Sequence, residues 1–421
     1  MAAPEVDDIV VSGLGVTSAI GQGRAAFSAA LLAGAHRFDI LRRPGRQRPE
    51  RTEHPGGGES AAPFIGAEID TLSMPASISK SLLRTASFSS QVALATLHEA
   101  WQDARLAGVD PRRIGLVVGG SNFQQRELVL AHEAYRGREQ FLRPTYAMGF
   151  MDSDLCGLCT ETFGIRGFAV TVGGASASGQ VAVIEAIEAV ASGRVDVCIA
   201  LGAMMDLSYW ECQAMTSLGA MGSVRYAGQP ALACRPFDRD RDGFVFGESC
   251  GALVIERAGG ALRRDAAPYA RLAGWAMCMD ANRNPNPSME GEVAAIGGAL
   301  ARAGLAAGDI DYVNPHGTGS GIGDITELES LARCGLDHAW LNVTKSLIGH
   351  GLCAAGAVEL IAVLLQMREG RLHPSRNLDH PIAPELKWVR GEAVGHRIEN
   401  ALNLSMGFGG MNTALCVQRW A

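Results

Sequence analysis

The chain begins with short apolar runs that alternate with glycine-rich turns and segments of helical periodicity. An apolar run from residue 9 enters the turn SGLGVTSAIGQG, and a helical pattern follows from about Gly23. A longer helical pattern covers 80–108, and the apolar run IGLVVGG follows at 114–120. Short apolar runs bounded by glycine are typical of buried strands, and helical patterns between them indicate α/β units. The pattern predicts an α/β fold.

Two apolar helical segments repeat each other 177 residues apart along the chain. SGQVAVIEAIEAVASGR at 178–194 and AGAVELIAVLLQMREGR at 355–371 share a small-residue start, an apolar helix and a final Gly-Arg. The common helical period alone explains part of this match. The other explanation is a duplicated α/β unit, whose two helices would meet back to back near a pseudo-twofold axis.

Composition narrows the class of protein. The 421 residues are 47% apolar and carry a formal charge of -7, which argues against nucleic acid or an anionic membrane as the main partner. No apolar run approaches the ~20 residues of a membrane span. Asp7 and Asp8 interrupt the start where a signal peptide would be apolar, and the ten cysteines are scattered, so we expect a cytoplasmic location. We expect Cys156 and Cys159 to be half-buried thiols, because no second pair at metal-ligand spacing follows.

Residues 41–63 combine proline, glycine and charge with few apolar side chains. Such a stretch has little to bury, so we expect a mobile surface loop there.

Four glycine-rich segments carry polar residues beside apolar strands, where α/β folds usually hold their active sites. They are residues 234–256, 313–324, 342–356 and 403–415.

Two histidines in these segments have glycine neighbours. His316 follows an apolar strand, and His350 lies in the turn before the second repeated helix. A structural histidine with satisfied hydrogen bonds is the alternative for each. Two histidines in two such turns favour a shared site, because the repeated helices would face each other.

Lys345 is one of only three lysines in the chain, with Lys80 and Lys387, whereas the other residues of formal positive charge are arginines. Its compact ammonium group differs from the guanidinium groups that the chain uses elsewhere. Glu248 is a candidate partner for this lysine. The other interpretation of Glu248 is a carboxylate that caps a helix. The other interpretation of Lys345 is a solvated surface side chain.

Several long motifs resemble the β-ketoacyl synthases of the thiolase superfamily and occur in that family's order. They are VVSGLGVTSAIGQG at 10–23, RPFDRDRDGF at 235–244, HGTG at 316–319, KSLIGH at 345–350 and GFGG at 407–410. The resemblance implies a thiolase-like, five-layered α-β-α-β-α fold of two duplicated halves, which we place at 1–257 and 258–421. It also implies a homodimer, and substrates carried as thioesters on the phosphopantetheine arm of an acyl carrier protein, with no cofactor bound by the protein itself.

Ser176 stands where the resemblance places the family's nucleophilic cysteine. The family motif T-A-C-x-S-G aligns with GASASG at 174–179. A cysteine near neutral pH is partly ionised, and a helix N-terminus lowers its pKa further, whereas a serine hydroxyl needs an adjacent base. We therefore expect acyl loading and condensation to be slow or absent, with Ser176 acting as a small hydrogen-bonding residue beside the substrate carbonyl.

The resemblance gives the histidines a separate task. In the family they donate hydrogen bonds to the thioester oxygen of a malonyl group while CO2 leaves, and one such donor is worth about 10²–10³ in rate. His316, His350 and Lys345 are all present. We therefore expect decarboxylation of malonyl-acyl carrier protein to acetyl-acyl carrier protein without elongation. The chain resembles the ketosynthase-like decarboxylases of polyketide β-branching cassettes, which supply a hydroxymethylglutaryl-synthase-like partner.

Further residues take their expected roles from the resemblance. Thr318 and Ser320 match the hydroxyls beside the pantetheine amides, Phe408 matches the gating aromatic, and Gly409 follows it in GFGG.

Three other interpretations stay open at this point. In an acyltransferase, Ser176 would become acylated with His316 or His350 as base. A silent partner subunit, like a chain-length factor, would turn nothing over alone. The third is an ordinary condensing enzyme whose cysteine an experimenter has replaced by serine, which would show the same motifs.

Overall fold

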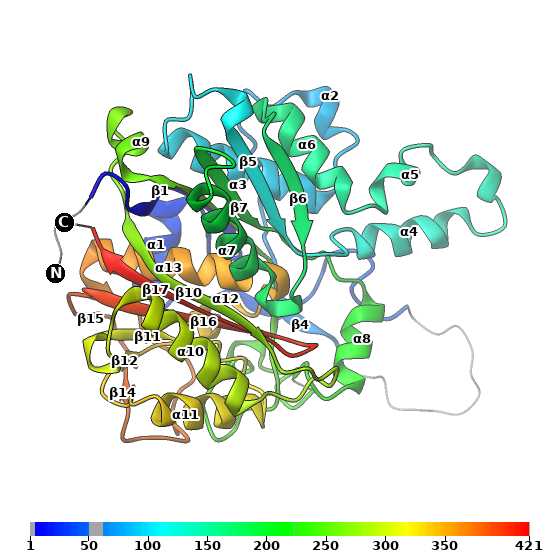
Figure 1. The fold of residues 1–421 in the computed structure, drawn as a ribbon. Coiled ribbons are helices and arrows are strands. Elements are labelled where there is room, and N and C mark those ends of the chain that lie inside the picture. The colour runs from blue at the N-terminus through cyan, green and yellow to red at the C-terminus, as the bar shows by residue number, and fades with distance from the viewer. Residues whose placement is uncertain (1–4, 50–61, 223, 421) are drawn as a thin grey trace.

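The computed structural model describes residues 5–49, 62–222 and 224–420. A mixed twelve-stranded sheet, flanked and divided by helices, dominates these residues (Figure 1). Its strands from the first part of the chain are β1 (Ile9–Ser18), β2 (Gly21–Gln22), β5 (Ile114–Gly119), β6 (Phe168–Val172), β7 (Val197–Gly202) and β9 (Ser249–Arg257). Those from the second part are β10 (Ala270–Met279), β11 (Tyr312–Asn314), β12 (Trp340–Leu341), β14 (Lys387–Trp388), β16 (Asn400–Gly407) and β17 (Met411–Arg419).

The strand order repeats. Across the sheet the order is β6-β5-β7-β9-β1 in the first half and β12-β11-β16-β17-β10 in the second. If these five strands are numbered along the chain in each half, both halves have the order third, second, fourth, fifth, first. In each half the pairs around the second strand are parallel and those of the fifth strand are antiparallel. The chain is therefore built of two related halves, joined where β1 pairs with β10. The division at 257 and 258 falls between β9 and α9 (Ala258–Arg263), and as a domain boundary it stays a prediction.

The first strand of each half bends at a glycine. The register shifts between Val11 and Gly13 in β1 and between Leu272 and Gly274 in β10. A Cβ on Gly274 would lie 2.2 Å from the carbonyl oxygen of Ala299, in the helix at 289–303. One on Gly13 would lie 2.7 Å from the carbonyl oxygen of Ala100, in the helix at 88–103. Both glycines therefore allow a helix to cross the strand closely.

The helices form three layers around the two halves of the sheet. The outer layers hold α3 (Phe88–Asp103) and α6 (Ser153–Phe163) on one side, and α10 (Met289–Ala303) and α11 (Gly323–Arg333) on the other. The middle layer holds α7 (Ser178–Ala191) and α13 (Ala355–Glu369), which pack against each other and against both halves. The repeated segments thus form the two central helices, as a duplication predicts.

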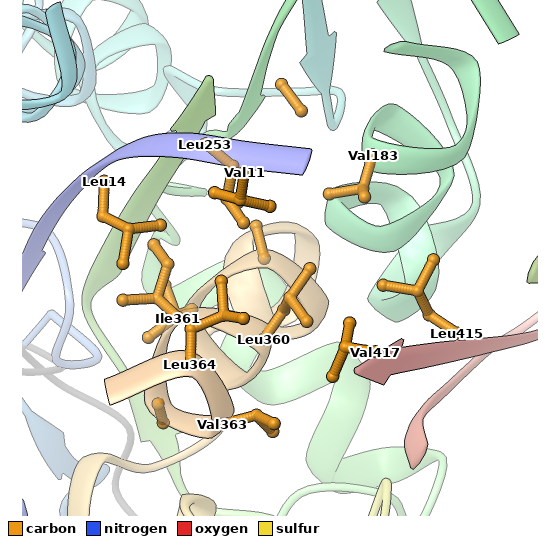
Figure 2. Packing of buried hydrophobic residues seen from close by; sticks show 14 of the residues in the cluster. Val11, Leu14, Val183, Leu253, Leu360, Ile361, Val363, Leu364, Leu415 and Val417 are labelled. Carbon is orange, nitrogen blue, oxygen red and sulfur yellow. The ribbon is translucent and has the colours of Figure 1, made fainter. Parts of the chain in front are cut away.

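The core between the halves is built around α13 (Figure 2). Its apolar face meets side chains from both halves: Leu360, Ile361, Val363 and Leu364 of α13 pack with Val11, Leu14, Val183, Leu253, Leu415 and Val417. Because residues 355–367 of α13 are all buried and mostly apolar, the helix is stable only where it is enclosed by other elements.

Shorter elements complete the described chain. The helices are α1 (Arg24–Leu32), α2 (Lys80–Leu83), α4 (Gln125–Tyr135), α5 (Tyr146–Gly149), α8 (Tyr209–Ser217) and α12 (Lys345–Ile348). The strands are β3 (Phe38–Ile40), β4 (Ile65–Ala67), β8 (Phe246–Gly247), β13 (Arg371–Leu372) and β15 (Val394–Gly395). In Figure 1, α4 and α5 extend as an arm beside β6.

Two expectations from the sequence need correction. The helical pattern over 80–108 is two helices, α2 and α3, because Ser87 caps the second by accepting the N–H of Ser90. The expected loop at 41–63 is not a free surface loop over 41–49, because Arg46 is fully buried there. Residues 50–61 of that loop lie outside the described residues.

All ten cysteines are free thiols, and Cys156 and Cys159 are both buried in α6. The described ranges contain no cluster of side chains suited to a metal ion. Within the same ranges, none of the helices combines the length and apolar character that crossing a bilayer requires.

Candidate active site

Ser176 lies in a single 3-10 turn, Ala175–Ala177, immediately before α7. Ala175 has a φ of 47°, and Leu352, at the same place before α13, has a φ of 49°. Such left-handed backbone is uncommon outside glycine, so the duplication extends to a strained turn in each half. Gly407 at the end of β16 closes the turn from the other side, because a Cβ there would lie 2.0 Å from the carbonyl oxygen of Gly174.

The two histidines meet at this turn. His350 Nε2 lies 2.9 Å from Ser176 Oγ. The rings of His316 and His350 are nearly perpendicular, with centroids 5.6 Å apart. The structure therefore brings Ser176, His316 and His350 together, although 140 residues or more separate the serine from either histidine.

Hydrogen bonds fix which histidine nitrogens carry hydrogen. The backbone N–H of Leu352 donates to His350 Nδ1 at 3.3 Å, so Nδ1 is an acceptor. The hydrogen of a neutral ring is then on Nε2, which donates it to Ser176 Oγ. In His316, Nδ1 faces the amino group of Lys345 at 3.5 Å, which leaves Nε2 of that ring as its donor as well.

Both imidazoles are neutral. Burial, followed by the charge of Lys345, holds the pKa of His350 well below its usual value. The same two causes, with His350 as a third, lower the pKa of His316. The site thus offers two neutral N–H donors, which suits the stabilisation of an oxygen that gains negative charge.

Lys345 lies behind His316, fully buried at the start of α12. Its amino group donates to the carbonyl oxygen of His316 and forms an ion pair with Glu359 of α13. The proposed pairing of Lys345 with Glu248 is wrong. Glu248 instead pairs with Arg43 at 2.8 Å and Arg46 at 2.6 Å, so it anchors residues 41–49.

Several carboxylates of the site escaped the sequence analysis. Glu327 of α11 accepts the N–H groups of His316 at 2.5 Å and Gly317 at 2.9 Å. Asp324, one turn earlier, accepts the N–H of Gly319 at 3.0 Å, so two acids hold the HGTG turn. Glu359 was detectable as the single charged residue in the first thirteen positions of α13, since a buried carboxylate needs a partner.

A cavity of ≈ 230 Å³ opens from the site. Its walls include Ser176, His316, His350, Thr318, Ser320 and Phe408. The side chain of Phe408 is 42% exposed, as suits an aromatic at the mouth of a cavity. Gly409 continues the same turn with a φ of 93°. The roles of Thr318, Ser320, Phe408 and Gly409 toward a pantetheine arm remain predictions.

Comparison with known proteins shows the family of this chain. The family models for the beta-ketoacyl synthase N-terminal and C-terminal domains match residues 6–261 and 269–379. The chain is 59% identical to the polyketide biosynthesis malonyl-ACP decarboxylase PksF of Bacillus subtilis, over 99% of this chain and 98% of that protein. It is 33% identical to a putative polyketide beta-ketoacyl synthase of Streptomyces halstedii, over 97% of each.

The fold agrees as well. The crystal structure of a beta-ketoacyl synthase from Burkholderia phymatum superposes with a TM-score of 0.85 at 28% identity, covering 98% of this chain and 99% of that one. The predicted thiolase-like fold is therefore confirmed, and the chain belongs to the beta-ketoacyl synthase family.

Proposed function

We propose that this protein decarboxylates malonyl-acyl carrier protein to acetyl-acyl carrier protein and does not elongate it. The observation that carries the proposal is the hydrogen bond from His350 Nε2 to Ser176 Oγ at 2.9 Å, beside a second neutral imidazole. The site has two donors for a thioester oxygen and no strong nucleophile where the family holds its cysteine.

The chemistry follows from these donors. The malonyl thioester enters on the phosphopantetheine arm past Phe408. Its carbonyl oxygen accepts a hydrogen bond from His316 and replaces Ser176 Oγ as the acceptor of the His350 N–H. The C2–carboxylate bond breaks, CO2 leaves, and the electron pair moves onto the thioester as an enolate. The two N–H groups stabilise the negative oxygen, and the low pKa of each ring keeps it neutral and able to donate.

The acyltransferase alternative fits this geometry poorly. To remove a proton from Ser176, His350 would need a lone pair on Nε2, but the Leu352 N–H at Nδ1 places the hydrogen on Nε2. The hydroxyl is therefore an acceptor at rest, and an ester on Ser176 is not expected.

The similarity to PksF supports the same reaction, because that protein is named a malonyl-ACP decarboxylase of polyketide biosynthesis. We extend the proposal to polyketide β-branching, with a hydroxymethylglutaryl-synthase-like enzyme that uses the acetyl product, and to a cytoplasmic location.

The decisive experiment is to incubate the protein with malonyl-acyl carrier protein and follow the mass of the carrier. Acetyl-carrier should appear without any longer chain, and His316→Ala should slow its appearance by about 10²–10³-fold. Unchanged malonyl-carrier would favour a silent partner subunit. A stable acyl adduct on Ser176 in the intact protein would favour the acyltransferase.

The same proposal includes a homodimer formed through β6. This strand ends the sheet path, and its residue Val170 is 39% exposed. The neighbouring arm exposes Phe141, Met148 and Phe150. An apolar edge strand beside an apolar arm is typical of a surface that another chain covers. Light scattering during size-exclusion chromatography should give twice the 44.3 kDa chain mass, and Val170→Lys should lower it toward one chain.

A further inference from the structure

The proposed reaction, on which this inference rests, leaves one requirement unmet, namely a proton for C2 of the enolate. Neither histidine can supply it readily, because each neutral ring carries one N–H, and losing that hydrogen would leave an imidazolate anion. Ser176 accepts a hydrogen bond from His350, and an alcohol is a weak acid. A decarboxylase that does not pass its carbanion to an acyl group needs another acid.

Glu292 of α10 lies in the wall of the cavity that Ser176, His316 and His350 also line. Its side chain is buried, at 2% exposure. Its Oε2 has no hydrogen-bond partner among the residues that the structure describes. A buried charged carboxylate normally finds donors, since leaving it without them is costly. A buried oxygen without a donor is less costly on a neutral carboxyl group than on a carboxylate, so this position favours the protonated form.

The neighbours of Glu292 favour the same protonation state. Burial raises the pKa of Glu292 to about 7, with the Ser330 hydroxyl opposing and the charge of Asp280 reinforcing the shift. Burial, followed by the charge of Glu292, raises the pKa of Glu327 to about 8. The two carboxyls therefore titrate as a pair that shares a proton near neutral pH. Glu327 accepts two backbone N–H groups, which favour its charged form, whereas Oε2 of Glu292 has no donor among the described residues. On this geometry, and against the order of the two pKa values, the shared proton is assigned to Glu292.

The other acids in the described cavity wall are engaged. Asp280 accepts the side-chain N–H of Asn412 at 2.7 Å. Asp324 accepts the N–H groups of Phe237 at 2.6 Å and Gly319 at 3.0 Å. The thiol of Cys353 is a weaker acid, because burial raises its pKa.

We propose that Glu292 is the acid that protonates the enolate. After the C2–carboxylate bond has broken and CO2 has left, the electron pair on C2 takes the proton of the Glu292 carboxyl. A C–H bond forms, the enolate oxygen returns to a carbonyl, and Glu292 is left as a carboxylate. Solvent returns one proton to Glu292 before the next turnover, so one malonyl thioester and one proton give one acetyl thioester and one CO2.

The test compares Glu292→Gln with Glu290→Gln, a matched change at an exposed position of the same helix. Acetyl-carrier formation from malonyl-carrier is measured at steady state from pH 5.5 to 9. We expect Glu292→Gln to lower kcat by about 100-fold or more, with KM little changed, and Glu290→Gln to match the wild type.

The pH profile separates an acid from a structural residue. Asp280, which follows β10, and Glu327 and Cys334, on and just after α11, interact with this carboxyl, and each negative charge among them favours its protonated form. The wild-type kcat should fall as pH rises through about 7 to 8, and this fall should be absent in Glu292→Gln. A wild-type kcat that is level across that range would overturn the inference even if the variant failed to fold.

The outcomes also distinguish this inference from the proposed function. If the wild type leaves malonyl-carrier unchanged, the proposed function itself fails. If the wild type makes acetyl-carrier and folded Glu292→Gln retains its rate and pH profile, only the role of Glu292 fails.

Discussion

Ser176 shows how one side chain redirects a site whose other parts are kept. The hydroxyl receives a hydrogen bond from a neutral imidazole, whereas a thiol in its place would be able to ionise beside the N-terminus of α7. The donors that stabilise an enolate do not depend on the atom at residue 176. Loss of condensation and retention of decarboxylation are therefore separable at the level of single residues.

Ser176→Ala should keep decarboxylation within about tenfold of the wild type, because the histidines make the hydrogen bonds that matter to the enolate. Ser176→Cys should acquire an acyl group from acyl-carrier protein, because a thiol is the better nucleophile. Intact-protein mass spectrometry measures the acylation, and the carrier assay measures the rate. A hundredfold loss in Ser176→Ala would show that the hydroxyl takes part in the chemistry.

Lys345 has both an electrostatic and a structural effect. Its charge lowers the pKa of His316 and His350, so Lys345→Met should raise both values toward the usual range. The acid side of the kcat profile should then move to higher pH. As pH falls, rings with a raised pKa become protonated earlier and lose the neutral form that the reaction needs. Glu359 would be left buried and unpaired, which should cost about 3–5 kcal/mol of stability. Lys80→Met, at an exposed position, is the control for both measurements.

The elements were predictable where local pattern determines them. The two central helices, their 177-residue offset and the glycine-rich turns are visible in the sequence, because apolar periodicity and small residues act locally. The partner of Lys345 was not predictable in this way. The sequence does not distinguish Glu248, which precedes β9, from Glu359 of α13 until both elements are placed in space. Arg46 was missed for the same reason: its partners Glu68, Asp206 and Glu248 come from distant segments.

Gly179 shows how closely the two central helices approach. A Cβ there would lie 2.9 Å from the backbone nitrogen of Ala357 and 2.9 Å from the carbonyl oxygen of Cys353. Gly179→Ala should therefore force α7 and α13 apart, lower the free energy of unfolding by about 1–3 kcal/mol and slow decarboxylation by moving Ser176.

Gly157 offers the matched control in α6. A Cβ at Gly157 would meet no atom within 4 Å, so Gly157→Ala should stabilise the protein by up to about 1 kcal/mol through helix propensity. Urea denaturation of both variants gives the comparison. Equal stability of the two would show that the central helices can separate without cost.

The molecule as a whole encloses many ionisable groups in its core, and they act on stability in two directions. Burial lowers the pKa of His373 to about 4 and holds those of His316 and His350 well below the usual value. These rings destabilise the folded state as pH falls below about 6.5, because the unfolded chain then binds protons that the folded chain does not. The raised carboxyls have the opposite sign, since the folded chain keeps protons that the unfolded chain has lost.

Above pH 6.5 only the carboxyl effect remains. The pKa of Glu292 is raised to about 7 and that of Glu327 to about 8, so the stability that their retained protons provide is lost as pH rises through this range. Each retained proton gives a slope of about -1.4 kcal/mol per pH unit. We expect the free energy of unfolding to fall from pH 6.5 toward pH 8.5, and urea titrations at five pH values would measure this. The fall should be shallower in Glu292→Gln and unchanged in Glu290→Gln. A stability that is level from pH 6.5 to 8.5 in the wild type would mean that the two carboxyls are already ionised in the folded protein, and that the core accommodates both charges.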